Sequence, residues 1–127
     1  NQRYFKQMDS DEKKTILNAL GINGPFFLFL GSIQPRKNLI RLLEAHKLLP
    51  RDLARSHPLV IAGKLAWDDG SISRAIQEGV HEDRVRQLNY INESEKQCLL
   101  QSATALAFVS QYEGFGLPLM VRGLDYQ

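Results

Sequence analysis

The sequence predicts an α/β domain in which a parallel sheet carries helices on both faces. Apolar runs of strand length alternate with segments of helical periodicity along nearly the whole chain. The runs are continuously apolar, which is typical of parallel strands that are buried on both sides. Strands separated by helices indicate βαβ units with right-handed crossovers. The fold class is therefore a Rossmann-like parallel sheet with helices on both faces.

The individual elements follow from local signals. Four strands are expected, over residues 26–31, 58–63, 84–90 and 105–110. A leading helix over residues 9–20 has a capping residue, Asp9 or Ser10, and stops at Gly21. Three further helices are expected over residues 37–49, 71–78 and 93–103. Proline suits a first helical turn, so another helix is expected to begin at Pro118.

Composition limits the classes of function. The 127 residues, 43% hydrophobic and 24% charged, suffice for one globular domain. Sixteen Lys and Arg against 14 Asp and Glu give a formal charge of +2, which does not indicate a nucleic-acid partner. No apolar run reaches the roughly 20 residues of a membrane span, and no signal-peptide pattern is seen. A cytoplasmic domain is expected.

The cysteine and the histidines do not indicate a metal site. The single cysteine, Cys98, lies in an expected amphipathic helix and is interpreted as a buried thiol of a reducing compartment. His46, His57 and His81 are scattered without a partner pattern, and surface or capping roles are expected for them. No cluster with metal-ligand spacing occurs in the sequence.

Candidate site residues follow the strands, because such sheets bind ligands outside the carboxyl ends of their strands. The first loop runs from Gly31 and brings Arg36 and Lys37 to the start of a helix. The backbone there already presents about half a positive charge, so two adjacent cations indicate a bound phosphate or diphosphate. The alternative is that both side chains reach into solvent.

The second loop offers a close backbone approach to a ligand. Gly63 would let the chain turn past the ligand, and Lys64 could reach the same anion. Trp67 fits either a pocket wall or the cover of the core.

The third loop combines a carboxylate with glycines. Gly114 and Gly116 allow backbone N–H groups to be exposed ahead of Pro118. Glu113 repels phosphate, so neutral hydroxyls, as on a sugar, suit it best. An ordinary strand-to-helix turn with a solvated Glu113 is the alternative.

Residues 27–49, 58–67 and 85–120 together resemble a known family. They look like the nucleotide-sugar-binding C-terminal domain of the group 1 (family 4) retaining glycosyltransferases of GT-B architecture, and the likeness runs from about residue 21 to 120. It implies that Arg36 and Lys37 neutralise the donor diphosphate and that Glu113 contacts the transferred sugar. It also implies that the donor is bound along Gly31, Gly63, Tyr90, Ile91, Gly114, Phe115, Gly116 and Leu117, with Tyr90 and Ile91 near the nucleotide base.

The chain also departs from the family pattern. Eight residues after Glu113 the family carries a second Glu for the ribose hydroxyls, where this chain has Val121. Ser32 and Asn89 stand where many relatives have Arg and Gly, and residues 121–127 leave the pattern. We interpret residues 1–127 as a single, C-terminally incomplete donor-binding domain, with residues 1–20 as its leading helix and an N-terminal acceptor-binding domain missing. Residues 105–109 would then form an open sheet edge, and self-association through them is expected unless the tail covers it.

The function implied by the resemblance is hexose transfer from a nucleotide diphosphate sugar to a glycan or lipid-linked acceptor, with retention of configuration. The donor is a substrate, and no cofactor or metal is expected. The reaction would occur in the cytoplasm or at the inner face of the membrane, and this chain alone is expected to be inactive. A non-catalytic nucleotide- or phosphate-binding domain is the alternative, while the lack of G-x-G-x-x-G after the first strand disfavours a dehydrogenase or epimerase.

Overall fold

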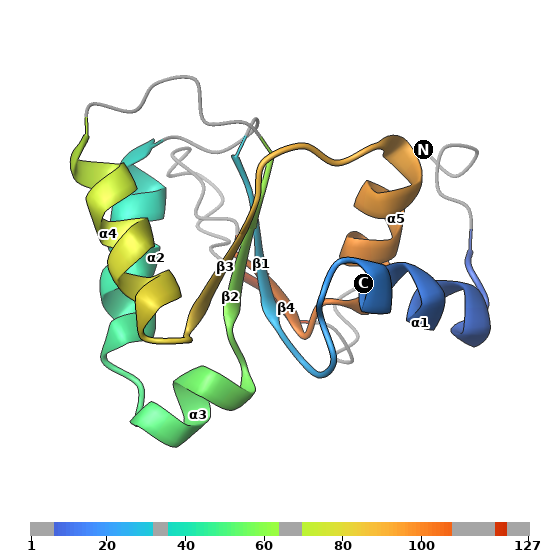
Figure 1. Cartoon of the computed structure of the whole chain (residues 1–127), viewed down its shortest axis with the longest axis horizontal. Coiled ribbons are helices and arrows are strands. Elements are labelled where there is room, and N and C mark those ends of the chain that lie inside the picture. Colours follow the sequence, from blue (N-terminus) through green and yellow to red (C-terminus); the bar gives the residue numbers. More distant parts are fainter. Residues whose placement is uncertain (1–6, 32–35, 64–69, 108–118, 122–127) are drawn as a thin grey trace.

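One five-stranded sheet organises the protein (Figure 1). The computed structural model describes residues 7–31, 36–63, 70–107 and 119–121. The strand order is β3–β2–β1–β4–β5, with the first four parallel and β5 antiparallel to β4. The strands are β1 (Phe27–Leu30), β2 (Leu59–Ala62), β3 (Val85–Leu88), β4 (Ala105–Ala107) and β5 (Leu119–Val121). The predicted fold class is confirmed, and each of the four predicted strands contains an observed one.

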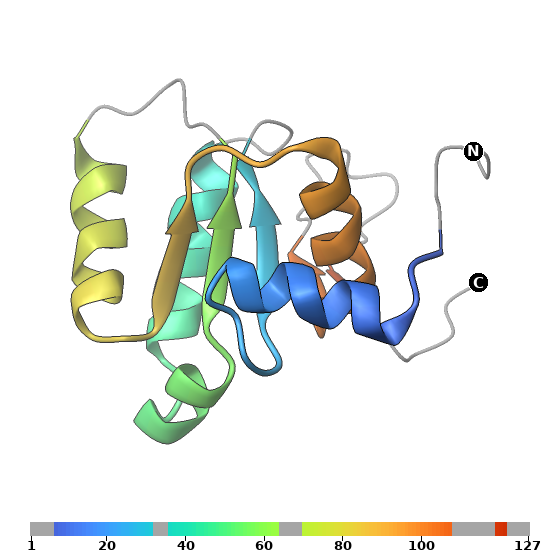
Figure 2. The same ribbon diagram turned by 45° about the vertical axis from the view of Figure 1, so that its right-hand side comes forward.

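Helices cover both faces of this sheet. Figures 1 and 2 show α2 and α4 on one face and α1 and α5 on the other. The helices are α1 (Ser10–Ala19), α2 (Arg36–Lys47), α3 (Arg51–Ser56), α4 (Ser71–His81) and α5 (Glu93–Ser102). Within the described residues, no helix has the length and apolar character needed to cross a bilayer.

Strand β1 contributes to a hydrophobic core on each face. Leu28 and Leu30 pack into a cluster with Leu99 of α5, whereas Phe29 packs into a second cluster with Leu39 of α2 and Ile76 of α4. Burying one such side chain fully stabilises the fold by roughly 1.5–3 kcal/mol. Both faces of β1 are buried, which explains its continuously apolar sequence.

The ends of α1 form as predicted. Asp9 is the N-cap, and its Oδ1 accepts a 2.8 Å hydrogen bond from the backbone N–H of Glu12. The chain leaves the helix through Gly21, whose φ of 80° lies in the left-handed region that glycine adopts easily.

The helix predicted from Pro118 is wrong for residues 119–121. Leu119–Val121 forms β5, and Val121 lies opposite Ala105 in the antiparallel register. The backbone N–H and C=O groups along the outer side of β4 need partners, and three apolar residues in extended conformation provide them. The predicted open edge is therefore wrong for Ala105–Ala107, which removes the reason for self-association there. Phe108 and Val109 lie outside the described residues.

Helix α3 was not predicted from the sequence. Pro50 was interpreted as the end of the preceding helix, but it is also the N-cap of α3. Asp52 in the first turn and Arg55 in the last turn complement the helix dipole. With six residues, α3 is too short to show helical periodicity.

The expectation of a surface or capping role is wrong for His46. Its side chain is buried beside Phe27, and its Nε2–H donates a 2.9 Å hydrogen bond to the carbonyl oxygen of His57. Burial lowers the pKa of His46 from its ordinary value, against the raising effect of that hydrogen bond. Among the described residues, Nδ1 has no hydrogen-bond partner.

The interpretation of Cys98 as a buried thiol is confirmed. Cys98 is fully buried, and its Sγ–H donates a 3.5 Å hydrogen bond to the carbonyl oxygen of Lys13. Burial raises the pKa of the thiol, so the neutral form is favoured.

We expect His46 to make stability fall in mild acid. Its pKa in the folded state lies below the unfolded value of 6.5, so the unfolded state binds more protons as the pH falls through about 6.5. The associated stability is present above that pH and is lost below it. His46→Gln, whose amide can still donate to His57, should flatten the dependence between about pH 7 and 5. Urea unfolding curves across this range give the measurement. The exposed His81 offers a control, His81→Gln, and an unchanged slope in His46→Gln would assign the effect to another group.

We also expect Gly79 to tolerate no larger side chain. A Cβ placed there would conflict with Cγ2 of Val85 and lie 2.9 Å from its Cβ, because α4 packs closely on β3. Gly79→Val should therefore lower the free energy of unfolding by about 2–3 kcal/mol, towards the upper end for overpacked cores. Gly24→Val is the matched control, since nothing lies within 4 Å of a Cβ at Gly24. Equal losses in the two variants would contradict the packing argument.

Candidate functional site

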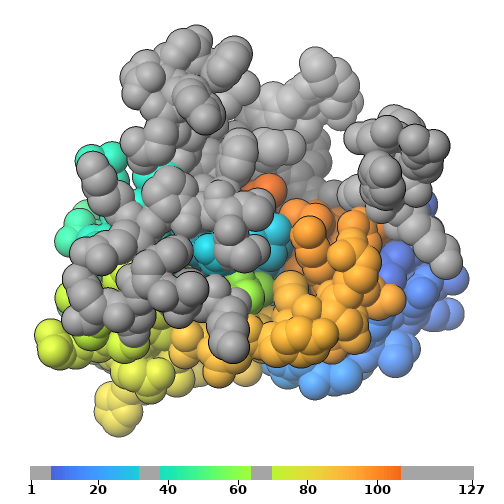
Figure 3. All heavy atoms as spheres, turned by 90° about the horizontal axis from the view of Figure 1, so that it is seen from above, coloured from blue at the N-terminus to red at the C-terminus, as the bar shows by residue number. Residues whose placement is uncertain are grey.

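The carboxyl ends of the parallel strands gather the predicted site residues at one edge of the sheet. Gly31 follows β1, Gly63 follows β2 and Tyr90 comes two residues after β3. Figure 3 looks down onto this end of the sheet, with the ends of β1 and β2 near the centre and α4 and α5 to either side. The N–H of Gly63 donates a 2.9 Å hydrogen bond to the carbonyl oxygen of Leu88, and the φ of Gly63 is 101°. The turn after β2 therefore requires glycine, as the sequence suggested.

The amino end of α2 lies at the same edge of the sheet. Arg36 and Lys37 are the first two residues of this helix, and the next two in its first turn are Asn38 and Leu39. Asn38 is only 1% exposed and Leu39 is fully buried. The first N–H groups of a helix have no partner within the helix, so this end attracts an anion. The predicted place of both cations at a helix start is confirmed.

Asn38, a buried residue beside the candidate site, was not predicted from the sequence. Its signal in the sequence is the spacing of Asn38, Leu42 and His46, which puts two polar residues on the inner side of α2 with a leucine between them. Asn38 is thus a buried polar residue in the first turn of α2, beside the candidate anion site.

The segment predicted to hold the nucleotide base is fixed on one side and exposed on the other. Tyr90 is 83% exposed, while Ile91 packs against the core cluster that contains Leu28. Asn92 then caps α5: its Oδ1 accepts from the N–H of Glu95 at 2.7 Å, and Glu95 Oε1 accepts from the N–H of Asn92 at 2.9 Å. An aromatic ring held at the surface by a fixed backbone is suited to stacking on a planar ligand.

Glu113 belongs to a connection that starts and ends at this edge. Ala107, the last residue of β4, lies opposite Leu119, the first residue of β5. The chain thus leaves the sheet at β4, the neighbour of β1, and returns to it at β5, on the other side of β4. Several predicted residues lie outside the described residues, so their places stay predictions: Ser32, Lys64, Trp67, Glu113, Gly114, Phe115, Gly116 and Leu117.

Val121 lies away from the candidate site. It is opposite Ala105, at the amino end of β4, whereas the candidate site is at the carboxyl end. Position 121, where the resembled family carries its second Glu, therefore lies at the end of β4 opposite the candidate site.

The comparison with known proteins identifies the family. Residues 12–120 match the model of the glycosyl transferases group 1. The chain belongs to this family. It is similar to O-antigen chain mannosyltransferase B of Escherichia coli, with 34% identity over 95 residues that cover 75% of this chain and 25% of that protein. It is also similar to the serotype-specific mannosyltransferase WbdA of Escherichia coli, with 30% identity over 95 residues that cover 73% of this chain and 12% of that protein.

The match concerns one part of the relatives only. This chain spans about a quarter or less of the length of the curated group 1 relatives described above. The family assignment from the sequence is confirmed, while the roles of individual residues stay predictions.

We expect the Asn92 cap to stabilise the segment that carries Tyr90. Asn92→Ala removes the acceptor for the N–H of Glu95, and loss of such a cap costs about 0.5–2 kcal/mol of stability. Asn92→Asp keeps an acceptor at the same place and should retain most of the stability of the wild-type protein. Denaturant unfolding of the three proteins tests this expectation, and equal losses for Ala and Asp would mean that the capping bond contributes little.

Proposed function

We propose that this group 1 domain binds the diphosphate of a nucleotide sugar at the carboxyl edge of its sheet, as the donor-binding part of a retaining hexosyltransferase. The observation that carries the proposal is the start of α2, where Arg36 and Lys37 open the helix beside the ends of β1 and β2. Backbone N–H groups and two cations then act on the same anion. The family membership supports a glycosyl donor as the molecule that carries this anion.

The residue roles in this proposal are electrostatic and positional. Arg36 and Lys37 stabilise the negative charge that develops on the leaving diphosphate, which is where an enzyme gains most by pre-arranged charge. Glu113 accepts hydrogen bonds from the sugar hydroxyls, and the backbone from Gly114 to Leu117 borders the sugar and phosphates. Tyr90 and Ile91 border the base. Gly31 and Gly63 let the chain pass close to the donor.

The transferred sugar and the acceptor follow from the relatives. Both relatives described above are named mannosyltransferases, which favours mannose as the hexose. The acceptor, a glycan or a lipid-linked molecule, would be bound by a separate N-terminal domain. Retention of configuration and a site of action in the cytoplasm or at the inner face of the membrane stay predictions.

A non-catalytic binding domain is the second candidate. The observation that favours it is Val121 in β5, which leaves no carboxylate at the position where the family binds the ribose. Such a domain would bind phosphate or nucleotide without transferring a sugar.

We expect the Arg36→Ala/Lys37→Ala variant to lose donor binding. Each cation would supply a charge-assisted hydrogen bond of about 1.5–3 kcal/mol, so the double variant should bind at least about 100-fold more weakly. Calorimetry with guanosine diphosphate mannose and uridine diphosphate glucose measures the affinity and ranks the two donors.

The matched control removes the same charge elsewhere on the surface. Lys14→Ala/Arg41→Ala changes two exposed cations, one on α1 and one on the outer side of α2. Its affinity should stay within about twofold of the wild-type protein. Retained donor binding in Arg36→Ala/Lys37→Ala would remove the diphosphate assignment.

A further inference from the structure

A second group of cations lies at the opposite end of the sheet, by the amino ends of β2 and β3. A cavity of about 570 Å³ opens there, which is within the usual range of small-molecule sites. Its lining consists of Lys47, Leu49, Arg51, Ala54, Arg55, His81, Glu82 and Arg84. Four of these residues are permanent cations and one is a carboxylate. The four residues of β2, about 13 Å of strand, separate this cavity from Gly63 at the other edge.

Arg84 forms the buried floor of the cavity. Its side chain is 9% exposed, although guanidinium groups are seldom buried without compensation. The backbone of Arg84 is fixed on both sides, because its N–H donates to the carbonyl oxygen of Gly79 and its own carbonyl accepts from the N–H of Leu59, each at 3.0 Å. The position of this cation is therefore set by the packing of α4 and β2 rather than by a flexible loop.

The carboxylate of Glu82 occupies only a small part of the hydrogen-bond donors of the Arg84 guanidinium. Arg84 Nε–H donates to Glu82 Oε1 at 2.7 Å, and within the described residues no other hydrogen bond from that guanidinium is seen. A guanidinium has five N–H donors, so four remain. Arg84 also lowers the pKa of Glu82, chiefly through this hydrogen bond.

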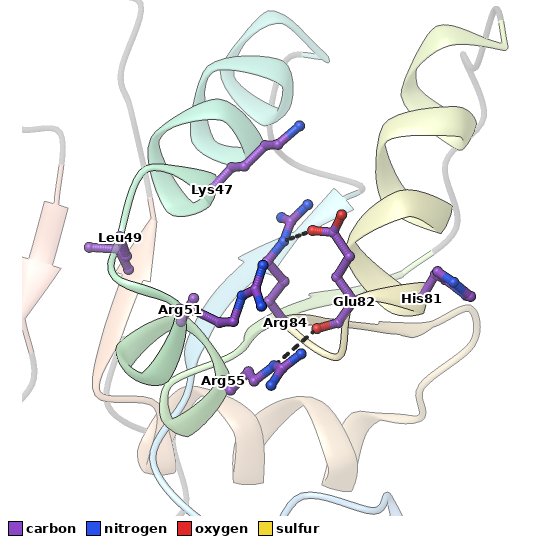
Figure 4. Close-up of a pocket in the computed structure, with 8 residues that line it drawn as sticks. Lys47, Leu49, Arg51, Arg55, His81, Glu82 and Arg84 are labelled. Carbon is purple, nitrogen blue, oxygen red and sulfur yellow. Dashed lines mark hydrogen bonds and ion pairs between the residues drawn. The ribbon is translucent and has the colours of Figure 1, made fainter.

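Helix α3 brings two more guanidinium groups to the same place. Figure 4 shows Arg51 and Arg55 pointing from α3 towards Glu82. Arg55 Nε–H donates a long 3.4 Å hydrogen bond to the backbone carbonyl of Glu82, and no ion-pair partner of Arg55 is seen among the described residues. In the described part of the chain Arg51 has no ion-pair partner.

Lys47 and His81 have structural reasons to be where they are. Lys47 pairs with Glu78 Oε2 at 3.2 Å, and both Lys47 and His81 lie in the last turns of their helices, where a cation is favourable. Arg55 likewise lies in the last turn of α3, but Arg51 opens that helix, where a cation is unfavourable, and Arg84 lies outside the helices. The three guanidinium groups gather around one residue, Glu82, whose carboxylate forms an ion pair with Arg84 alone among the described residues, so they repel one another unless a further anion is bound.

We propose that this cavity is a second anion site that binds a phosphate group between Arg51, Arg55 and Arg84. Guanidinium forks match phosphate oxygens in bidentate geometry, and a phosphate monoester carries close to two negative charges at pH 7. The volume leaves room for the rest of a phosphorylated small molecule. A lipid headgroup offers the same chemistry at a membrane surface. The site is independent of donor binding at the carboxyl edge.

The first experiment titrates the protein with inorganic phosphate and follows backbone amide and arginine Nε–H signals by NMR. We expect shifts at residues 51–55 and 82–84 with an apparent Kd of about 1 mM or tighter. The Arg51→Gln/Arg55→Gln variant should weaken this binding at least about 10-fold. The Arg41→Gln/Arg74→Gln variant removes the same charge from exposed positions of α2 and α4 and should change the affinity less than twofold.

A gain of affinity separates a binding site from a purely structural cluster. Glu82→Gln removes the competing carboxylate and frees Arg84, so phosphate should bind about two- to fivefold more tightly. If the arginines only hold α3 against α4 and β3, this variant would gain nothing. Unshifted signals at residues 51–55 and 82–84 up to about 10 mM phosphate, or equal affinity in Arg51→Gln/Arg55→Gln, would overturn the proposal.

Vesicles distinguish the two sources of the phosphate. Phosphatidylcholine vesicles with and without phosphatidylglycerol are sedimented with the protein. Binding to the anionic vesicles that inorganic phosphate competes away, and that Arg51→Gln/Arg55→Gln abolishes, supports a lipid headgroup. Phosphate binding without vesicle binding supports a phosphorylated small molecule. Vesicle binding that survives in Arg51→Gln/Arg55→Gln while that variant also keeps its phosphate affinity would place the anion elsewhere and contradict the proposal.

Discussion

The pairing of β1 with two parallel neighbours is the constraint on which the rest of the structure depends. Leu28 pairs with Val60 of β2 and with Leu106 of β4, so both backbone edges of β1 are satisfied inside the protein. Parallel neighbours cannot be joined by a tight turn, so the chain must cross back over a face of the sheet each time. The crossing helices bury Phe29 on one face and Leu30 on the other. The same geometry sends every loop that follows a parallel strand to one edge, which is why Gly31, Gly63 and the start of α2 meet there.

Elements that depend on a local sequence pattern were predicted correctly, whereas elements that depend on a pairing partner far along the chain were not. The apolar run at residues 58–63 and the cap at Asp9 carry their own signals, and both were found as predicted. Strand β5 has no signal of its own, because it forms to satisfy the backbone of Ala105–Ala107, whose partners lie 12 to 16 residues later in the chain, from Ala107 opposite Leu119 to Ala105 opposite Val121. His46 is buried because its side of α2 faces the sheet, and helical spacing from Leu39 and Leu42 could have shown this. Glu113 was predicted from its neighbours alone and lies outside the described residues, so its place stays a prediction.

The two ends of the sheet use positive charge for different physical reasons. At the carboxyl edge, Arg36 and Lys37 begin α2, where the helix dipole disfavours a cation, and the proposed anion would offset that cost. At the amino edge, Lys47 and His81 agree with the dipoles of α2 and α4 and stabilise those helices without a ligand. Arg84 fits neither case, since it is buried, fixed by its backbone and paired with a half-exposed carboxylate. Position relative to a helix end thus distinguishes cations that the helix dipole favours from those that it disfavours, and burial identifies Arg84 as the exception.

Strand β5 and the family's ribose contact compete for the same residues. A helix over residues 119–121 would continue from the carboxyl edge and could present a side chain at position 121 to the donor. Antiparallel pairing instead carries Val121 to the opposite end of β4. Because valine has no hydrogen-bond acceptor in its side chain, pairing as a strand loses no ribose contact, while it satisfies the backbone of β4. In this chain the balance between the two conformations is therefore set by the sheet, and under the proposed function the donor would be held through its phosphates, its sugar hydroxyls and its base.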